Sequence, residues 1–164
     1  MKRRTSKSKY FYLALFAAFL WYQGPSIMNS LMKEGTRIAP TSYPVLYPAG
    51  KGSVSLSEGK KVVIFWASWC GPCKIDMKRF KHSVEDRTIA AENIFAINPF
   101  ETPEEVLKFL ETNPYPFTFL DAKPLAQELK ITVTPTEVFV ENGTVARMSI
   151  GMSIIGILRA ESFL

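Results

Sequence analysis

Cys70 and Cys73 are the only two cysteines of the chain, and they stand in the tetrapeptide Cys70-Gly71-Pro72-Cys73. The tetrapeptide follows a hydrophobic, β-prone run at 62–66, so the sequence predicts a strand, a short turn and then a helix. Such a helix places Cys70 at its N-terminus, where unpaired backbone N–H groups and the helix dipole favour a thiolate. Cys73, in the first turn, can reach the first sulfur and close a small disulfide ring. The pair predicts a redox site with Cys70 as the nucleophile and Cys73 as the resolving thiol.

Two other uses of the cysteines are weaker but remain open. A structural disulfide gains stability by closing a long loop, and the loop between these cysteines holds two residues. A zinc site needs two further ligands, and His82 is the only histidine, so the metal would have to be shared between chains. His82 lies more than three helical turns after Cys70, which is too far for it to act as the base of that thiol.

The positive charge of the chain is concentrated at its N-terminus. The net charge is +5, and five of the 20 Lys and Arg residues lie within 1–9, so the other 15 match the 15 Asp and Glu residues. No basic stripe remains, and we therefore exclude nucleic acid as a partner. The length of 164 residues and the hydrophobic share of 47% predict one ordinary domain with a terminal appendage.

The basic n-region at 1–9 precedes an apolar segment at 10–32 that contains no charged residue. About 20 apolar residues can cross a bilayer as a helix, although polar residues and Pro25 weaken the second half of the segment. Basic residues before a span stay in the cytoplasm. We expect a single-pass signal anchor in the inner membrane, with the catalytic domain on the periplasmic side. The alternatives are a cleaved signal peptide, for which no small-x-small site follows Tyr22, and a buried helix.

The rest of the chain predicts a linker and edge segment at 33–52, which contains three prolines, and one α/β domain at 53–164. The hydrophobic pattern predicts strands at 53–56, 61–66, 93–98, 117–120, 136–140 and 144–150. Helices are predicted at 70–84, 103–112, 124–129 and from Ser153 to about 163. Asn142-Gly143 predicts a hairpin turn between the last two strands. The sum is a set of parallel βαβ units followed by a hairpin, with helices on both faces of the sheet.

Two motifs carry a family resemblance. Trp69-Cys70-Gly71-Pro72-Cys73 follows a strand and Thr134-Pro135-Thr136 precedes a hairpin, an arrangement that resembles the thioredoxin superfamily and, more closely, the TlpA/ResA-like membrane-anchored thiol-disulfide oxidoreductases. The resemblance covers about residue 39 to the C-terminus. It implies a thioredoxin-like three-layer sandwich with a mixed central sheet. It also implies a cis Pro135 that faces the sulfurs while the backbone of Thr134 pairs with an extended substrate.

The chain departs from thioredoxin at two positions and supplies one substitute. Ile64 stands where thioredoxin keeps a buried aspartate, and Lys78 stands where its helix usually carries a kinking proline. Asp76, three residues after Cys73, matches a functional acidic residue of the TlpA/ResA-like group and is expected to accept the proton of Cys73. The alternative is a solvated helix residue that pairs with a neighbouring lysine. Met77 and Phe80 are expected in the core.

These observations predict a membrane-tethered thiol-disulfide oxidoreductase that needs no cofactor beyond the Cys70–Cys73 disulfide. Cys70, Cys73 and Asp76 form the expected catalytic set, and the expected substrate-binding set is Trp69, Gly71, Pro72, Thr134 and Pro135. Trp66 and Trp69 are otherwise read as packing residues. The expected partners are protein thiols or disulfides, with apocytochrome c implied by the resemblance, and a membrane electron donor. Reduction of disulfides in extracytoplasmic proteins is the expected direction, although the Gly-Pro spacer alone does not fix it. Two rival functions stay open: Cu(I) binding by the cysteines and a scaffold without turnover.

Overall fold

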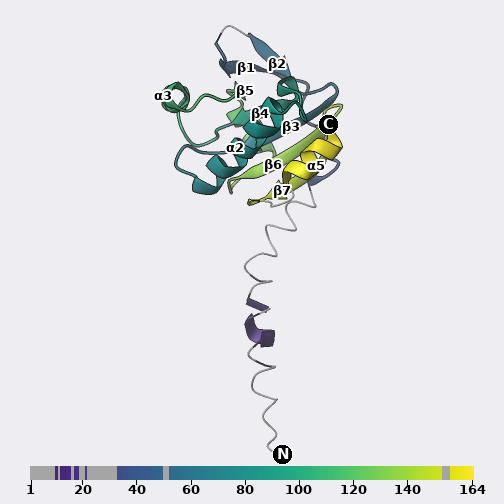
Figure 1. Cartoon of the computed structure of the whole chain (residues 1–164). Helices are drawn as coiled ribbons and strands as arrows, with labels where there is room; N and C mark the ends of the chain where they lie inside the picture. Colours follow the sequence, from purple (N-terminus) through teal and green to yellow (C-terminus); the bar gives the residue numbers. More distant parts are fainter. Residues whose placement is uncertain are drawn as a thin grey trace, which may run out of the picture.

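The computed structural model of the chain describes residues 10, 12–15, 17–18, 21, 33–49, 52–152 and 156–164 (Figure 1). From residue 42 onward, the elements follow in the order β1 (Ser42–Tyr47), β2 (Ser53–Ser55), β3 (Lys60–Phe65), α2 (Gly71–Glu85), a 3₁₀ turn (Ala91–Asn93), β4 (Ile94–Ile97), α3 (Pro103–Thr112), β5 (Thr118–Leu120), α4 (Lys123–Glu128), β6 (Thr136–Glu141), β7 (Thr144–Ile150) and α5 (Gly156–Phe163).

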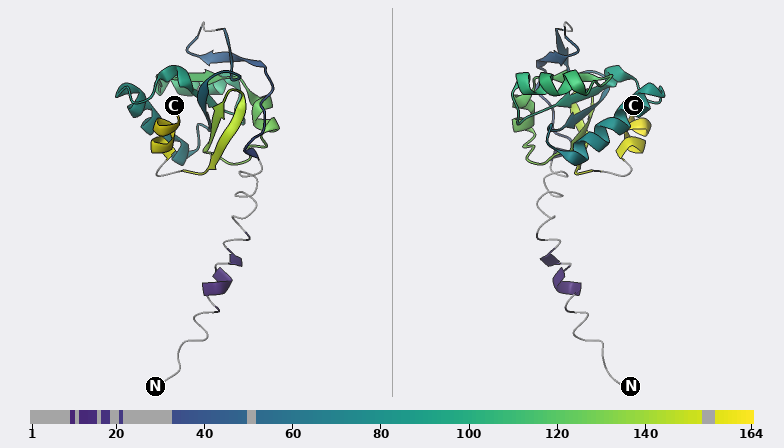
Figure 2. Two further views of the ribbon diagram at one scale, coloured as in Figure 1. Left: turned by 90° about the vertical axis from the view of Figure 1, so that its right-hand side faces the viewer. Right: turned by 60° about the vertical axis from the view of Figure 1, so that its left-hand side comes forward.

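The strands form one mixed sheet in the order β2-β1-β5-β4-β3-β6-β7. β3, β4 and β5 run parallel to one another, whereas β6 lies antiparallel to β3 and pairs with β7 through the predicted hairpin. Side chains of α2, α3 and α5 pack on one face of the sheet, and those of α4 pack on the other. The two rotated views in Figure 2 show these helices on either side of the strands. The predicted three-layer sandwich with a mixed sheet is confirmed.

β3 is the strand that leads to the cysteines, and both of its faces are covered. Val62 and Ile64 belong to the core beneath α2, while Val63 and Phe65 belong to the core beneath α4. Successive side chains of a strand point to opposite faces, so a strand buried on both sides must be apolar without alternation. The unbroken apolar run at 62–66 is what this central position requires, and the position fixes the point at which the chain turns toward Cys70.

β1 is the element that the sequence did not predict. It lies inside the segment 33–52, pairs antiparallel with β2 and β5, and contains Pro44. Pro44 has no backbone N–H to donate, but its carbonyl oxygen accepts a hydrogen bond from the backbone N–H of Asp121 at 2.9 Å. Ile38 and Tyr43 from the same segment are buried, at 3% and 5% exposure. The folded unit therefore includes residues that the sequence assigned to a linker.

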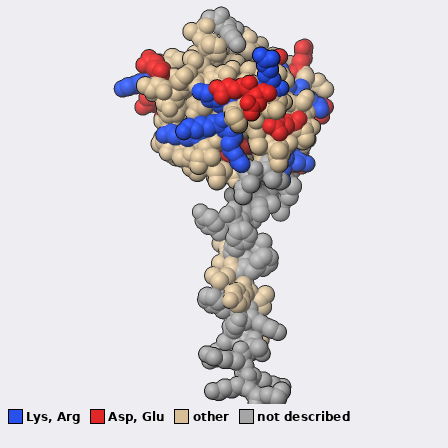
Figure 3. Space-filling view, viewed as in Figure 1, with Lys and Arg blue, Asp and Glu red and all other residues tan. Residues whose placement is uncertain are grey.

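The charges of the folded part are mixed rather than segregated. On the face shown in Figure 3, Lys and Arg side chains lie directly beside Asp and Glu side chains. This distribution agrees with the neutral balance of the chain after residue 9.

The expected membrane anchor falls mostly outside the described residues. Those described between 10 and 21 are helical. Within the described part of the chain, no helix combines the length and the apolar character needed to cross a bilayer. Ser153, the expected cap of the last helix, also lies outside the described residues.

Candidate active site

Cys70 is the N-cap residue of α2 and is joined to Cys73 by a disulfide bond, with the two Cα atoms 5.3 Å apart. Its backbone is extended, and its sulfur accepts a hydrogen bond from the backbone N–H of Cys73 at 3.2 Å. Pro72 lies in the first turn, where a residue without an N–H costs no intrahelical hydrogen bond. Cys70 is 6% exposed and Cys73 is 0% exposed. The start of α2 therefore directs a backbone N–H at the sulfur of Cys70 and covers Cys73 completely.

The sheet brings three segments to the same end as Cys70. β3 ends at Phe65, which pairs with Thr136, so Pro135 immediately precedes the neighbouring strand at this end. The backbone N–H of Trp66 bonds the carbonyl of Ile97 at 3.1 Å, which holds the end of β4 beside the turn that leads to Cys70. The peptide bond between Thr134 and Pro135 is cis, as the resemblance implied. Pro135 is buried and Thr134 is half-buried.

An exposed aromatic pair lies beside the cysteines. Trp69 is 67% exposed, and its ring centroid is 5.9 Å from that of Phe100, which is itself 46% exposed. Trp66, in contrast, is 0% exposed and packs against Phe109 and Phe119. The expectation of core packing is thus confirmed for Trp66, whereas Trp69 forms surface. Phe100 was not predicted as a site residue.

Glu101, which was not predicted as a site residue, holds the turn that precedes Cys70. Its carboxylate accepts hydrogen bonds from the backbone N–H of Ser68 at 2.7 Å, from the Ser68 hydroxyl and from the Asn98 amide. Asn98 in turn accepts the backbone N–H groups of Phe100 and Glu101, each at 3.0 Å. Burial alone would raise the pKa of Glu101, but these hydrogen bonds and the charge of Lys74 lower it. The network ties the loop after β4 to the approach to Cys70.

Asp76 is buried within α2 at 2% exposure, which excludes the solvated alternative. Arg79 lies 3.7 Å from Oδ1, while Oδ2 has no hydrogen-bond partner among the described residues. Burial raises the pKa of Asp76, and the charge and hydrogen bond of Arg79 offset only part of that rise. The acid expected near Cys73 is therefore in the protein interior, where it favours its protonated form.

Glu137 on β6 is a second buried acid, and the sequence analysis missed it as well. It is 1% exposed, and its Oε2 has no hydrogen-bond partner within the described part of the chain. Burial raises its pKa to about 7, with a further contribution from the charge of Asp76 that Arg159 and Arg79 oppose. The alternation of β6 was the available signal, because Glu137 is two residues before Phe139 and so shares its apolar face.

Other groups that carry chemistry lie outside this site. His82 is exposed and pairs with Asp86 at 3.3 Å. No group of three or more His, Cys, Asp and Glu side chains suited to a metal ion occurs among the residues described. Met77 and Phe80 belong to the core as predicted.

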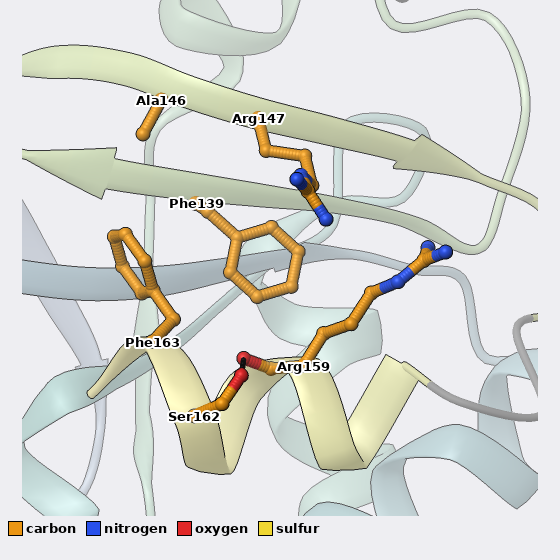
Figure 4. Close-up of a pocket in the computed structure, with 6 residues that line it drawn as sticks. All are labelled: Phe139, Ala146, Arg147, Arg159, Ser162 and Phe163. Atoms are coloured by element: carbon orange, nitrogen blue, oxygen red, sulfur yellow. Dashed lines mark hydrogen bonds between the residues drawn. The ribbon is translucent and has the colours of Figure 1, made fainter.

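A hollow of about 250 Å³ between the β6–β7 hairpin and α5 is lined by none of the predicted site residues. In Figure 4 the ring of Phe139 lies at its centre, among Phe163, Arg147 and Arg159. This hollow is therefore separate from the predicted site beside Trp69.

Comparison with solved structures supports the fold. StoA from Bacillus subtilis aligns with a TM-score of 0.62 at 21% identity, over 76% of this chain and 98% of that one. Among curated proteins, sporulation thiol-disulfide oxidoreductase A of Bacillus subtilis is 25% identical over 149 residues, which are 85% of this chain and 87% of that protein. The thiol:disulfide interchange protein HelX of Rhodobacter capsulatus is 36% identical over 70 residues, 42% of this chain and 38% of that protein.

The AhpC/TSA family pattern matches residues 45–148, which run from β1 into β7 and include both cysteines and Pro135. The matched region thus contains the helix that begins at Cys70, the cis peptide bond and the mixed sheet described above. The two curated relatives are named a sporulation thiol-disulfide oxidoreductase and a thiol:disulfide interchange protein. The chain therefore belongs to the AhpC/TSA family and is a thioredoxin-like thiol-disulfide oxidoreductase.

Proposed function

We propose that this protein reduces disulfide bonds in extracytoplasmic proteins and that Cys70 is the attacking group. The observation that carries the proposal is the position of Cys70 at the N-cap of α2, where its sulfur accepts the Cys73 N–H while Cys73 is covered. In the reduced protein the same N–H groups would stabilise a thiolate on Cys70. A sulfur that keeps a small accessible area beside a fully covered neighbour is the arrangement that thiol-disulfide exchange requires.

The reaction proceeds in two exchanges. The Cys70 thiolate attacks one sulfur of the substrate disulfide, a Cys70–substrate bond forms, and the other substrate sulfur leaves with the electron pair. Cys73 then loses its proton and attacks the Cys70 sulfur, which forms the Cys70–Cys73 bond and releases the second substrate thiolate. The substrate is reduced by two electrons and the protein is oxidised by two. No cofactor beyond the disulfide enters this cycle.

Asp76 is the proposed proton acceptor for Cys73. It is three residues further along α2, and both side chains are buried. An acid with a raised pKa holds a proton more firmly than a surface carboxylate, so it is a better base for a thiol near neutral pH. The unpartnered Oδ2 leaves an acceptor position in an otherwise covered region.

The substrate is proposed to bind as an extended segment along Thr134 and Pro135, with Gly71, Pro72 and Trp69 around the reacting sulfur. The exposed Trp69–Phe100 pair supports this assignment, because amphipathic aromatic surfaces recur at recognition sites. Extended segments add affinity through main-chain hydrogen bonds, and neighbouring side chains add specificity.

Residues 10–32 are proposed to tether the domain to the outer face of the inner membrane, where a membrane electron donor would reduce the disulfide again. The basic n-region before an uncharged segment supports this orientation. Apocytochrome c is the proposed substrate, on family resemblance.

A trapping experiment tests the mechanism. The Cys73→Ala variant should stall as a mixed disulfide through Cys70, so its covalent partners can be purified and identified, while Cys70→Ser should trap nothing. The wild type should reduce insulin in the presence of dithiothreitol, and both variants should lose that activity. Retained insulin reduction in Cys70→Ser would overturn the proposal, as would retention of stoichiometric copper by a wild type that has no reductase activity.

The direction of electron flow is tested by equilibration with glutathione. A reduction potential near about −270 mV would support a reductant, and one near about −120 mV would show an oxidant. The tether is tested by membrane fractionation with carbonate washing, followed by N-terminal sequencing. A mature chain that starts after residue 22 and stays soluble would show a cleaved signal peptide instead.

A further inference from the structure

Asp76 and Glu137 reach the same covered space from different elements. Glu137 pairs across the sheet with Ile64, and directly opposite residues of neighbouring strands share a face. Ile64 belongs to the core with Cys73 and Met77, so Glu137 points to the layer between the sheet and the helices α2 and α5. Asp76 enters this layer from α2 at 2% exposure. The two carboxyl groups are thus buried in the same layer as the resolving cysteine.

The charged groups around the pair do not neutralise it fully. Arg79 on α2 lies 3.7 Å from Asp76 and lowers the pKa of both carboxyl groups. Arg159 on α5, which borders the hollow in Figure 4, lowers that of Glu137. On the two neighbouring strands, Glu137 stands opposite the uncharged residues Ile64 and Ser149. One oxygen of each acid still has no hydrogen-bond partner among the described residues.

Two carboxyl groups in such a site lose their protons in separate steps, and the second step needs a higher pH than the first. Desolvation disfavours each charge and each charge disfavours the other, so one proton remains on the pair over a wide pH range. Burial and the charge of Asp76 raise the pKa of Glu137 to about 7 even against the two arginines. A purely structural pair would be expected to fill its hydrogen bonds, because an unpaired buried oxygen costs free energy.

We propose that Asp76 and Glu137 form one proton-sharing carboxyl pair and that Glu137, acting through Asp76, sets the pH at which Cys73 resolves the mixed disulfide. The inference rests on the proposed function, in which Cys73 must lose a proton before it attacks Cys70. When the pair has lost its shared proton, Asp76 accepts the proton of Cys73. The Cys70–Cys73 bond then forms and the substrate thiolate leaves with the electron pair. Glu137 is a positioning residue in this step.

A two-step release assay with the reduced, full-length protein in detergent tests the pair. Cys70 attacks the chromogenic disulfide DTNB and releases one thionitrobenzoate, and Cys73 then attacks Cys70 and releases the second. The second release by the wild type is expected to accelerate as the pH rises through about 7. In Glu137→Gln the midpoint is expected to move down by about one unit, because Asp76 alone is a more acidic group. The first release should be unchanged.

Glu141→Gln, at the exposed end of the same strand, is the matched control and should keep the wild-type profile. A Glu137→Gln profile that superimposes on the wild type would overturn the inference. A wild type that releases only one thionitrobenzoate would instead contradict the proposed function, so the two failures are distinguishable. If Glu137→Gln does not fold, ¹³C NMR of the wild-type side-chain carboxyls decides. A buried glutamate that titrates near its ordinary value of 4.5 would overturn the inference.

Discussion

Glu101 and Glu137 show that the pKa values of two glutamates in one site can shift in opposite directions. Glu101 receives three hydrogen bonds from Ser68 and Asn98, which stabilise its charged form. Glu137 has an unpartnered oxygen in the interior, which favours its neutral form. Neither role could be inferred from residue type, because an isolated glutamate in a sequence is most often a surface group. The partners that distinguish the two come from the loops after β3 and β4 and from the helices α2 and α5, and they meet only in the folded chain.

Replacement of Glu101 should destabilise the turn before Cys70. In Glu101→Gln, an amide N–H₂ meets the donors of Ser68 and Asn98, so we expect a loss of about 1 to 3 kcal/mol in the free energy of unfolding at pH 7. The lowered pKa of Glu101 gives stability that is present above 4.5 and is lost as the pH falls through the folded-state pKa. The difference should therefore shrink toward about pH 3. Urea titrations of both proteins measure it, with exposed Glu104→Gln as the control.

Glu137 should give the oxidised protein a stability that declines with rising pH. Its folded-state pKa is raised from 4.5 to about 7, so its contribution is fully present below 4.5 and is lost as the pH rises through about 7. The shift corresponds to about 3 kcal/mol. Urea midpoints of the oxidised protein at about pH 5 and about pH 8.5 should differ less in Glu137→Gln than in the wild type. Equal differences in the two proteins would contradict this expectation.

Most helices and strands could be predicted from the sequence, because their capping residues, turn residues and hydrophobic patterns agree with the positions that they take in the fold. The helix predicted to start at Thr102 appears as α3 with Thr102 as its N-cap, and Asn142-Gly143 forms the predicted turn. β1 could not be predicted, since proline disfavours a strand and this one depends on its pairing with β2 and β5. Asp76 was predicted from its spacing after Cys73. Glu137 was missed, although it shares the apolar face of Phe139, because its burial depends on α2 and α5 covering β6. The cysteines needed only the motif and its spacing, whereas the cis state of Pro135 was implied by the family resemblance.

The start of α3 tests the local signal directly. Thr102 accepts the Glu105 N–H at 3.3 Å, and Glu105 accepts the Thr102 N–H at 2.8 Å. Thr102→Ala removes the first bond and should cost about 1 kcal/mol in the free energy of unfolding, whereas Thr102→Ser keeps the hydroxyl and should cost less. Chemical denaturation of the two variants provides the comparison. An alanine variant as stable as the serine variant would show that the cap contributes nothing.

For the whole molecule, the segment before β1 is part of the fold. The backbone N–H of Ile38 bonds the carbonyl of Gly143 at 2.8 Å, and that of Gly35 bonds Val145 at 2.7 Å, so the segment covers the start of β7 at the edge of the sheet. Gly143 itself has a φ of +74°, and an added Cβ would lie 3.2 Å from Cα of Ser57. Covered edges limit pairing with other chains. The hairpin turn is therefore fixed from two sides.

Ile38 should matter as much as a core residue of the sheet. Its side chain is 3% exposed and belongs to the core beneath α4. Ile38→Ala should lower the free energy of unfolding by about 3 kcal/mol through lost burial and a residual cavity. Leu107→Ala on the exposed side of α3 is the control and should change it by less than about 1 kcal/mol. A small effect of Ile38→Ala would place this segment outside the cooperative unit.

The coverage of Cys73 has a kinetic consequence for the complete cycle. Electrons can enter the oxidised protein only through the sulfur by which they leave, because Cys73 is 0% exposed and Cys70 is 6% exposed. The electron donor and the substrate must then react with the Cys70 sulfur one after the other, and the two cannot form a ternary complex with the protein. Steady-state kinetics should give the parallel double-reciprocal lines of a ping-pong mechanism, with each partner inhibiting the other at high concentration.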